Sequence, residues 1–207
     1  MKRETMIEPP NRKEFFDQNA EQWDVISIHD LDKVDFITSL LKIRGEEHIM
    51  DIGAGTGVMV PFYERALSSG DVLAIDYSEK MVEVARKKYP YETHPNVEFK
   101  VKDLYEMDYQ DKFDIVVCYS CFPHFPDKPR AISILSKALR RNGTLMISHS
   151  CSRDRINQVH REGGDAISLD YLPSIEDLEI MFADAGIRTS YTEDDDDYFI
   201  IIGQKIH

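Results

Sequence analysis

The chain has 207 residues, of which 42% are hydrophobic, and its formal net charge is −13 at pH 7. This size and composition predict one folded domain with a substantial core. The acidic balance argues against a nucleic-acid partner, because binding to phosphates requires clustered lysine and arginine. No stretch approaches the ~20 apolar residues of a membrane span or has the form of a secretory signal. Three cysteines argue against a disulfide framework, so we expect a cytoplasmic protein.

Residues 1–45 are expected to form a helical cap. The polar stretch 1–10 ends in two prolines, which predicts a loose arm. Asn11 is a candidate cap for a helix whose apolar residues fall on one broad face: Phe15, Phe16, Ala20 and Trp23. A second helix is expected over 31–43.

A glycine-rich stretch follows, and the rest of the chain is organised around it. The apolar run 49–52 predicts a buried strand, and glycines at 53, 55 and 57 separate it from a helix that starts near Val58. A strand, a glycine turn and a helix form a nucleotide-type cofactor site, because glycines permit close approach and the amides of the helix start face the ligand.

The spacing of the glycines separates two classes of cofactor. A dinucleotide site requires G-x-G-x-x-G, and Val58 stands where the third glycine belongs, which disfavours a nicotinamide dehydrogenase. Asp51 precedes the first glycine. A carboxylate there would repel a pyrophosphate but suits a ligand that carries an ammonium and a sulfonium group.

Strands are then expected at 72–76, 96–101, 113–118 and 144–149, with helices at 79–88 and 131–140. Asp51, Asp76 and Asp103 each end or follow one of the first three strands. In a parallel sheet these acids would share the carboxyl edge, where α/β folds bind ligands. Asp76 follows the glycine loop at about the spacing of an acid that binds ribose hydroxyls.

These segments together resemble a known family. Asp51–Gly57, Asp76–Ser78 and Lys102–Leu104 resemble motifs I, II and III of the class I S-adenosylmethionine-dependent methyltransferases. The stretch 15–24 resembles the helix that precedes the domain in small-molecule members, and 119–127 resembles the motif IV region of the ubiquinone- and menaquinone-biosynthesis branch, of the methyltransferase-11 type.

The resemblance implies an α/β fold: a Rossmann-like, doubly wound, seven-stranded and mostly parallel sheet with an antiparallel last strand and helices on both faces. It implies S-adenosylmethionine as cofactor and S-adenosylhomocysteine as product, with in-line transfer of a methyl group to an O, N, S or C nucleophile of a small molecule. The whole chain would be one methyltransferase domain: a helical cap at 1–45, a cofactor-binding core at 46–150, and a substrate-pocket insertion with a terminal strand pair at 151–207.

The resemblance also assigns residues to the site. The cofactor-binding set would be Asp51, Gly53, Gly55, Gly57, Asp76, Tyr77, Met81, Asp103, Leu104, Cys118 and Tyr119. Phe16 and Trp23 would cover the open side of the site as a lid over cofactor and substrate.

The last third of the chain leaves the common pattern. We expect a helix over 151–165 that breaks at Gly163 and Gly164, a helix from Ser174 to Ala185, and strands at 187–192 and 198–205. The acidic run 193–197 is expected to be a solvated turn. The sequence leaves a monomer and a homodimer open.

Histidine is suited to proton transfer near neutral pH. His124, His149 and His160 are the candidate bases, since all three would lie near the carboxyl edge, and His149 leads because it ends a strand there. Four further histidines are expected to be structural: His29, His48, His94 and His207.

Two alternatives stay open. Sulfur and imidazole groups from two strand ends could converge on a metal or a metalloid substrate: Cys118, Cys121, His124, His149, Cys151 and His160. Buried cysteine is more often a small hydrophobe, so no metal is assigned. A non-catalytic protein that binds S-adenosylmethionine is the second alternative.

Overall fold

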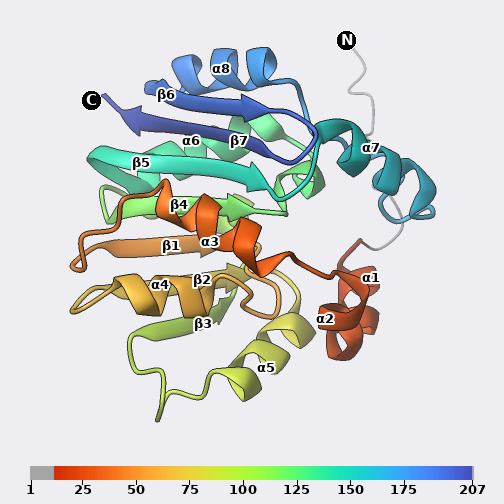
Figure 1. Ribbon diagram of the computed structural model, residues 1–207, viewed down its shortest axis with the longest axis horizontal. Coiled ribbons are helices and arrows are strands. Elements are labelled where there is room, and N and C mark those ends of the chain that lie inside the picture. The colour runs from red at the N-terminus through yellow and green to blue at the C-terminus, as the bar shows by residue number, and fades with distance from the viewer. Residues whose placement is uncertain (1–11, 207) are drawn as a thin grey trace.

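The computed structural model describes residues 12–206, which form one seven-stranded sheet in the order β3-β2-β1-β4-β5-β7-β6 (Figure 1). The neighbours from β3 to β5 are parallel, and β7 runs antiparallel to both β5 and β6. The expected doubly wound sheet with an antiparallel last strand is confirmed. The strands are β1 His48–Ile52, β2 Asp71–Asp76, β3 Val97–Val101, β4 Phe113–Tyr119, β5 Leu139–His149, β6 Ile187–Asp194 and β7 Phe199–Lys205.

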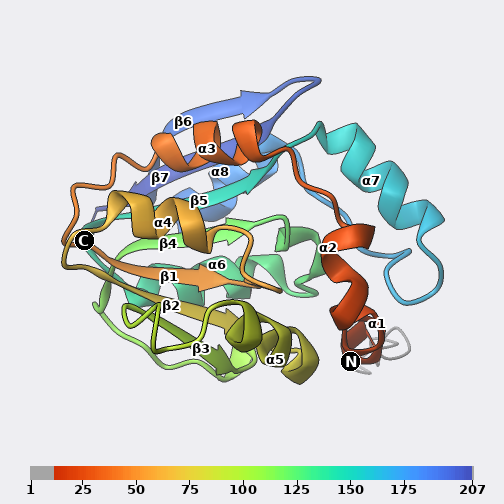
Figure 2. The same cartoon turned by 60° about the horizontal axis from the view of Figure 1, so that its bottom comes forward.

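Helices cover both faces of the sheet (Figures 1 and 2). One face carries α3 Leu31–Ser39, α4 Val60–Ala66 and α5 Glu79–Lys88; the other carries α6 Lys128–Ala138 and α8 Ile175–Asp184. At the carboxyl edge lie α1 Arg12–Asn19, a 3-10 turn Ala20–Gln22, α2 Trp23–Ile26 and α7 Arg153–Glu162. Two further 3-10 turns are η2 Leu104–Glu106 and η3 Phe122–His124. Of the helices within 12–206, none is long and apolar enough to cross a membrane.

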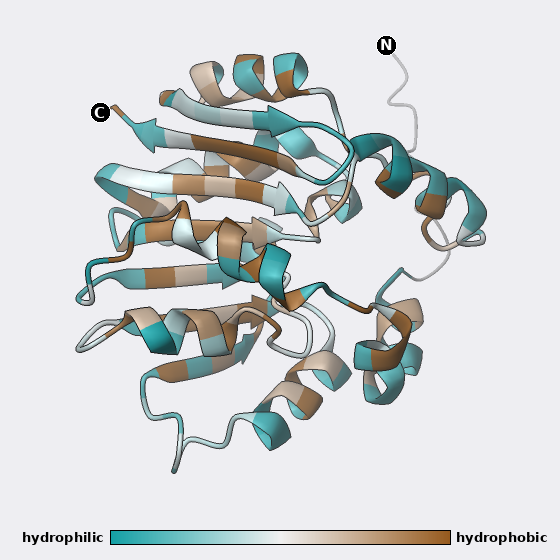
Figure 3. Cartoon of the chain, in the orientation of Figure 1, coloured by the Kyte–Doolittle hydropathy of each residue, from teal (hydrophilic) through white to brown (hydrophobic). Residues whose placement is uncertain are grey.

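Successive side chains of each strand point alternately to the two faces of the sheet, which divides the core into two layers. Figure 3 shows hydrophobic residues concentrated along the central strands. Met50 and Leu145 pack in the layer under α6 and α8, whereas Ile49 and Val72 pack in the layer under α3, α4 and α5. Because successive side chains of a strand point to opposite faces, position in the strand fixes the face. This rule also places the polar residues at the strand ends.

Several element boundaries differ from those expected. The helix expected over 31–43 ends at Ser39, and Lys42 has a left-handed φ of 52°. The helix expected to end near 140 stops at Ala138, because Leu139 already pairs with Phe113 of β4. The strand expected at 144–149 therefore begins earlier, at Leu139. The proposed cap at Asn11 and the arm at 1–10 lie outside the described residues.

Candidate active site

The glycine loop joins β1 to α4 and is held by the end of β2. The amides of Gly53 and Ala54 both donate to the carbonyl of Ile75, at 2.8 and 3.1 Å. Gly53 has a φ of +66°, and a Cβ there would lie 2.5 Å from the Cβ of Cys121. Only glycine fits this position. A Cβ at Gly57 would instead meet the Tyr89 ring at 2.8 Å, so Gly57 packs the loop against the protein.

Asp76 ends β2 and is buried beside this loop. Its Oδ2 accepts from the amide of Gly55 at 2.9 Å, and its Oδ1 accepts from the amide of Ser78 at 2.8 Å. Burial raises its pKa to about 6. The Asp76 carboxyl is therefore ionised in most molecules at neutral pH, and its fixed orientation lets it accept hydrogen bonds.

Asp51 lies in β1 and is 1% exposed. Its Oδ2 makes no hydrogen bond of normal geometry among residues 12–206. Burial, with the nearby charge of Asp76, raises its pKa to about 8. The buried hydroxyl of Tyr63, which is likewise unpartnered in this part of the chain, lies close enough to lower the pKa of Asp51, but less than burial raises it. A buried carboxylate oxygen without a partner is costly unless a ligand completes it, and a positively charged group would do so best.

A cavity of about 100 Å³ lies between the glycine loop, the ends of β2 and β4, the loop 120–125, and α1–α2. Ten of the residues predicted for the site line it: Phe16, Trp23, Asp51, Gly53, Gly55, Asp76, Tyr77, Met81, Tyr119 and His124. Small-molecule sites usually measure ~300–1,000 Å³. A ligand as large as a nucleoside sulfonium therefore needs the covering helices to move.

Residues 12–26, comprising α1, the 3-10 turn and α2, cover this cavity and are called the roof segment below. The Phe16 ring packs edge-on against Trp23, with centroids 5.3 Å apart, and against His124 at 5.0 Å. A Cβ added to Gly55 would lie 3.8 Å from Nε1 of Trp23, so the indole sits over the glycine loop. The structure thus places both aromatic residues of the expected lid over the cavity.

Other residues predicted for the cofactor site lie away from the cavity. Asp103 is exposed and caps η2, where its carboxylate accepts from the amide of Tyr105 at 2.8 Å. Leu104 is buried in the layer under α6 and α8. Cys118 belongs to the same layer because it is one position out of phase with Tyr119, whose hydroxyl faces the cavity side. Together with Gly57, these residues do not line the cavity.

His124 is the one predicted base in the cavity wall. Its Nδ1 lies 2.6 Å from Oδ2 of Asp170, which also accepts from Nε of Arg12 at 3.0 Å. Burial raises the pKa of Asp170, but the contacts with His124 and Arg12 outweigh it and hold the pKa below its ordinary value. The carboxylate orients the imidazole and leaves Nε2 for proton transfer. Sequence reasoning missed Asp170 and Arg12, which lie in no recognised motif.

His149, the leading base in the sequence, does not suit that role. It is 1% exposed, and neither ring nitrogen has a partner in the described part of the chain. It continues the alternation of Leu145 and Ile147 and therefore faces the α6/α8 layer, away from Asp51. Burial, with the charges of His160 and His124, lowers its pKa to about 3. So weak a base accepts few protons at neutral pH.

His160 packs its ring against that of His124, with centroids 4.9 Å apart, but does not line the cavity. Its Nδ1 is buried and has no partner within 12–206. Burial, followed by the charge of His124, lowers its pKa to about 4. His160 therefore supports His124 by packing and is itself a weak base.

His29, expected to be structural, lies in the cavity wall instead. Its Nδ1 is 2.8 Å from the hydroxyl of Tyr119, and its Nε2 is 3.2 Å from Oγ of Ser27. The Tyr119 hydroxyl also lies 2.9 Å from Oγ of Ser150. Burial lowers the pKa of His29 against the opposing charge of Asp24. This hydrogen-bonded row could not be found from the sequence, because His29 and Tyr119 are brought together only by the fold.

The cysteine–histidine cluster gives no metal centre in the described structure. Among residues 12–206, no three His, Cys, Asp or Glu side chains are grouped so that they could hold a metal ion. Cys121 is buried, and its Sγ donates to the carbonyl of Ile52 at 2.9 Å. Cys118 packs in the core. The metal-linked alternative thus has no ligand set here.

Comparison with known proteins identifies the family. A family model described as a methyltransferase domain matches residues 43–183. The chain belongs to this family. The methyltransferase class and the S-adenosylmethionine cofactor expected from the sequence are confirmed.

Two curated relatives illustrate the range of methyltransferases to which the chain is similar. Malonyl-[acyl-carrier protein] O-methyltransferase of Acetivibrio thermocellus is 26% identical over 145 residues, 69% of this chain and 50% of that protein. Demethylmenaquinone methyltransferase of Thermotoga maritima is 26% identical over 138 residues, 64% of this chain and 58% of that protein. This methyltransferase domain thus spans about half the length of these relatives.

Solved structures agree on the fold. A SAM-dependent methyltransferase from Aquifex aeolicus has a TM-score of 0.71 at 18% identity and covers 92% of this chain and 98% of its own. Magnesium protoporphyrin IX methyltransferase from Synechocystis, solved with bound SAH, has a TM-score of 0.71 at 20% identity, with 94% and 97% covered. A methyltransferase solved in complex with the Haloferax volcanii activator Trm112 has a TM-score of 0.75 at 17% identity, with 93% and 98% covered.

Proposed function

We propose that this methyltransferase domain methylates a small, uncharged or cationic acceptor, and that His124 accepts the acceptor's proton. The observation that carries the proposal is the unpartnered, buried oxygen of Asp51 at the floor of a cavity whose wall also holds His124. The first group suits a positively charged cofactor, and the second suits an acceptor that loses a proton. The cytoplasmic location and the monomeric or dimeric state remain predictions.

The residues at the glycine loop fit S-adenosylmethionine. When bound, this cofactor supplies an electrophilic methyl group on a sulfonium. Asp51 would pair with its ammonium group, Asp76 would accept hydrogen bonds from its ribose hydroxyls, and Met81 would pack on its adenine. Gly53 and Gly55 leave room for the ligand because no Cβ projects from them.

Charge in the cavity narrows the class of acceptor. Its described lining contains three acidic side chains, those of Asp24, Asp51 and Asp76, and neither lysine nor arginine. A carboxylate or phosphate of an acceptor would find no lysine or arginine there to pair with, would lie near acidic side chains and would lose its hydration on entry. Aromatic walls from Phe16, Trp23 and Tyr77 instead favour flat apolar groups and amines.

His124 is placed for proton transfer at the acceptor end. With Nδ1 held by Asp170, Nε2 would take the proton of an O–H or N–H as the methyl group forms its bond to that oxygen or nitrogen. The roof segment excludes water while this occurs, since Phe16 packs against the imidazole. Positioning the two reactants in line is the larger task, and the base assists it.

A metabolite-extract screen with labelled S-adenosylmethionine, followed by mass spectrometry of the labelled product, tests the proposal. We expect a neutral or amine-containing product whose formation requires His124. Transfer confined to carboxylate- or phosphate-bearing acceptors would contradict the charge argument. Binding of S-adenosylhomocysteine with no transfer across the extract would favour the non-catalytic alternative.

A further inference from the structure

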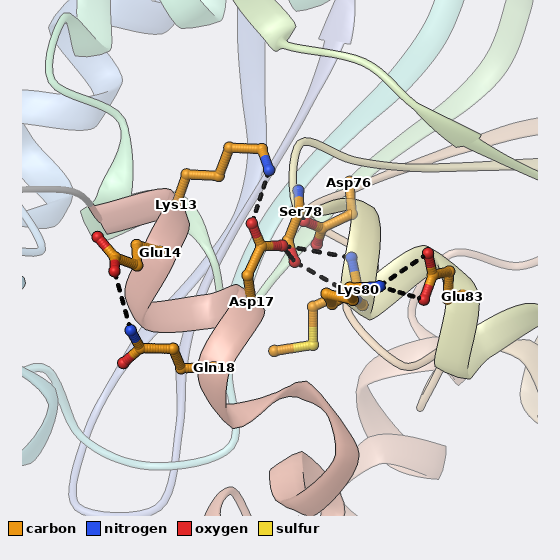
Figure 4. Close-up of polar contacts among 9 residues, drawn as sticks. Lys13, Glu14, Asp17, Gln18, Asp76, Ser78, Lys80 and Glu83 are labelled. Carbon is orange, nitrogen blue, oxygen red and sulfur yellow. Dashed lines mark hydrogen bonds and ion pairs between the residues drawn. The ribbon is translucent and has the colours of Figure 1, made fainter.

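We infer that Asp17 is a positioning residue for the cofactor: through Ser78 it couples closure of the roof segment to the orientation of Asp76. The inference rests on the proposed function, because it assumes that Asp76 binds the ribose. Figure 4 shows Asp17 on α1 pointing at the start of α5, between Lys13 and Ser78.

Three acidic residues of the roof segment contact the cofactor-binding core. Glu21 accepts from Lys87 at 3.0 Å in a pair whose side chains are more than two-thirds exposed. Asp24 accepts from Lys88 at 2.6 Å and from the hydroxyl of Thr56. Asp17 accepts from the Ser78 hydroxyl at 2.6 Å and from the amide of Lys80 at 3.3 Å. Of the three contacts, the last leads directly to a ribose-binding candidate.

Ser78 transmits the contact because its one hydroxyl proton and its backbone amide are both engaged in hydrogen bonds. It is buried, its hydroxyl oxygen accepts from the amide of Met81 at 3.1 Å, and its single hydroxyl proton goes to Asp17. Its own amide donates to Oδ1 of Asp76 at 2.8 Å. A closed roof therefore fixes the Ser78 side chain, and with it the turn that orients the Asp76 carboxylate (Figure 4).

Apolar contacts place Asp17 over the same turn. Phe16, Ala20 and Met81 form one buried cluster, with Tyr77 and Trp23 packed against it. Met81 and Tyr77 line the cavity and flank Ser78 in the sequence. When the roof opens to admit a ligand, the contact between Asp17 and Ser78 must break along with this cluster. Asp17 thus holds the closed roof segment against this turn, and closure raises the affinity for a bound cofactor.

The test is calorimetric binding of S-adenosylhomocysteine at pH 8, where Asp17 and Asp76 are both ionised. Asp17→Ala is expected to weaken binding about tenfold, since it removes a hydrogen bond to a charged group, and to raise the dissociation rate. Asp17→Asn keeps an oxygen that accepts from Ser78 and should restore most of the affinity. Glu21→Ala, the matched control on the same roof segment, should change affinity less than about twofold.

A double-mutant cycle separates positioning from general loss of the roof. In an Asp76→Ala background, Asp17→Ala should have little further effect, because the carboxylate that it orients is absent. Equal losses for Asp17→Ala and Glu21→Ala, or an undiminished loss in the Asp76→Ala background, would overturn the inference. Failure of the wild-type chain to bind S-adenosylhomocysteine would overturn the proposed function as well, and the two failures are therefore distinguishable.

Discussion

The two ends of the cavity are constructed differently. At the cofactor end, Asp76 is oriented by backbone amides of Gly55 and Ser78, and the glycine loop is pinned to the carbonyl of Ile75. At the acceptor end, His124 is held by Asp170 and packed by Phe16 of the roof segment. The backbone contacts that orient Asp76 form within the core, and the closed roof tightens them through Ser78, whereas the side chains at the acceptor end come from separate segments and need the roof closed. The cofactor end is therefore largely preformed, and the acceptor end is assembled on closure.

This difference predicts which property each substitution changes, and the largest effect belongs to His124. His124→Gln should lower kcat about 100-fold or more with the acceptor from the metabolite screen, because the proton acceptor is lost. Its affinity for S-adenosylhomocysteine should change little. His149→Gln is the control, since His149 lies in the other layer, and should retain kcat within about threefold if the variant folds. Equal losses of kcat in His124→Gln and His149→Gln would contradict a specific role of His124 as the base.

Asp76→Ala should weaken binding of S-adenosylhomocysteine about 100-fold, since the ribose hydroxyls lose a charged acceptor. The control is Asp71→Ala, because Asp71 lies at the opposite end of the same strand and is exposed. Isothermal titration calorimetry on both variants measures the effect. Unchanged affinity in Asp76→Ala would show that the ribose binds elsewhere.

Gly53→Ala should destabilise the fold by about 2–4 kcal/mol, because the new Cβ meets Cys121 and the backbone is left-handed. Gly164 also has a left-handed φ, of +80°, but has nothing within 4 Å of an added Cβ. Gly164→Ala should therefore cost only about 1 kcal/mol. Urea unfolding measures the loss of stability in both variants, and the difference between them is the cost of the contact between the new Cβ and Cys121. Equal losses would mean that the loop relaxes to avoid this contact.

The buried carboxyl of Asp51 predicts proton release at the cofactor end. With a pKa of about 8, Asp51 is mostly protonated at pH 7 in the free protein, and a bound cation should favour the ionised form. Calorimetry at pH 7 in buffers of different ionisation enthalpy should report release of up to about one proton. In Asp51→Asn this release should disappear. The same raised pKa makes the folded state bind this proton more tightly than the unfolded chain, so its contribution to stability declines as pH rises towards 8.

The cofactor end was predictable because its parts are close in sequence. Asp51 in β1 and the glycines at 53 and 55 follow closely in the sequence, and Asp76 ends the next strand, so glycine spacing and strand ends predicted that these residues line one cavity. The sheet, with its antiparallel last strand, followed from the same pattern and the family resemblance. Helix ends were less certain: local spacing does not show that Leu139 already pairs with β4.

The acceptor end could not be predicted in the same way. His124 and Asp170 are 46 residues apart, and His29 and Tyr119 are 90 apart, so their contacts depend on tertiary packing. The sequence did contain one signal that places His149 correctly. His149 shares the strand phase of the apolar Leu145 and Ile147, and that alternation places it in the layer opposite Asp51.

The most direct test of the account is a crystal structure of the protein with S-adenosylhomocysteine. We expect the ligand at the glycine loop, with its amino group near Asp51, its ribose hydroxyls on Asp76, and the roof segment closed over it. A ligand seated away from this loop, or one whose ribose makes no contact with Asp76, would contradict the account.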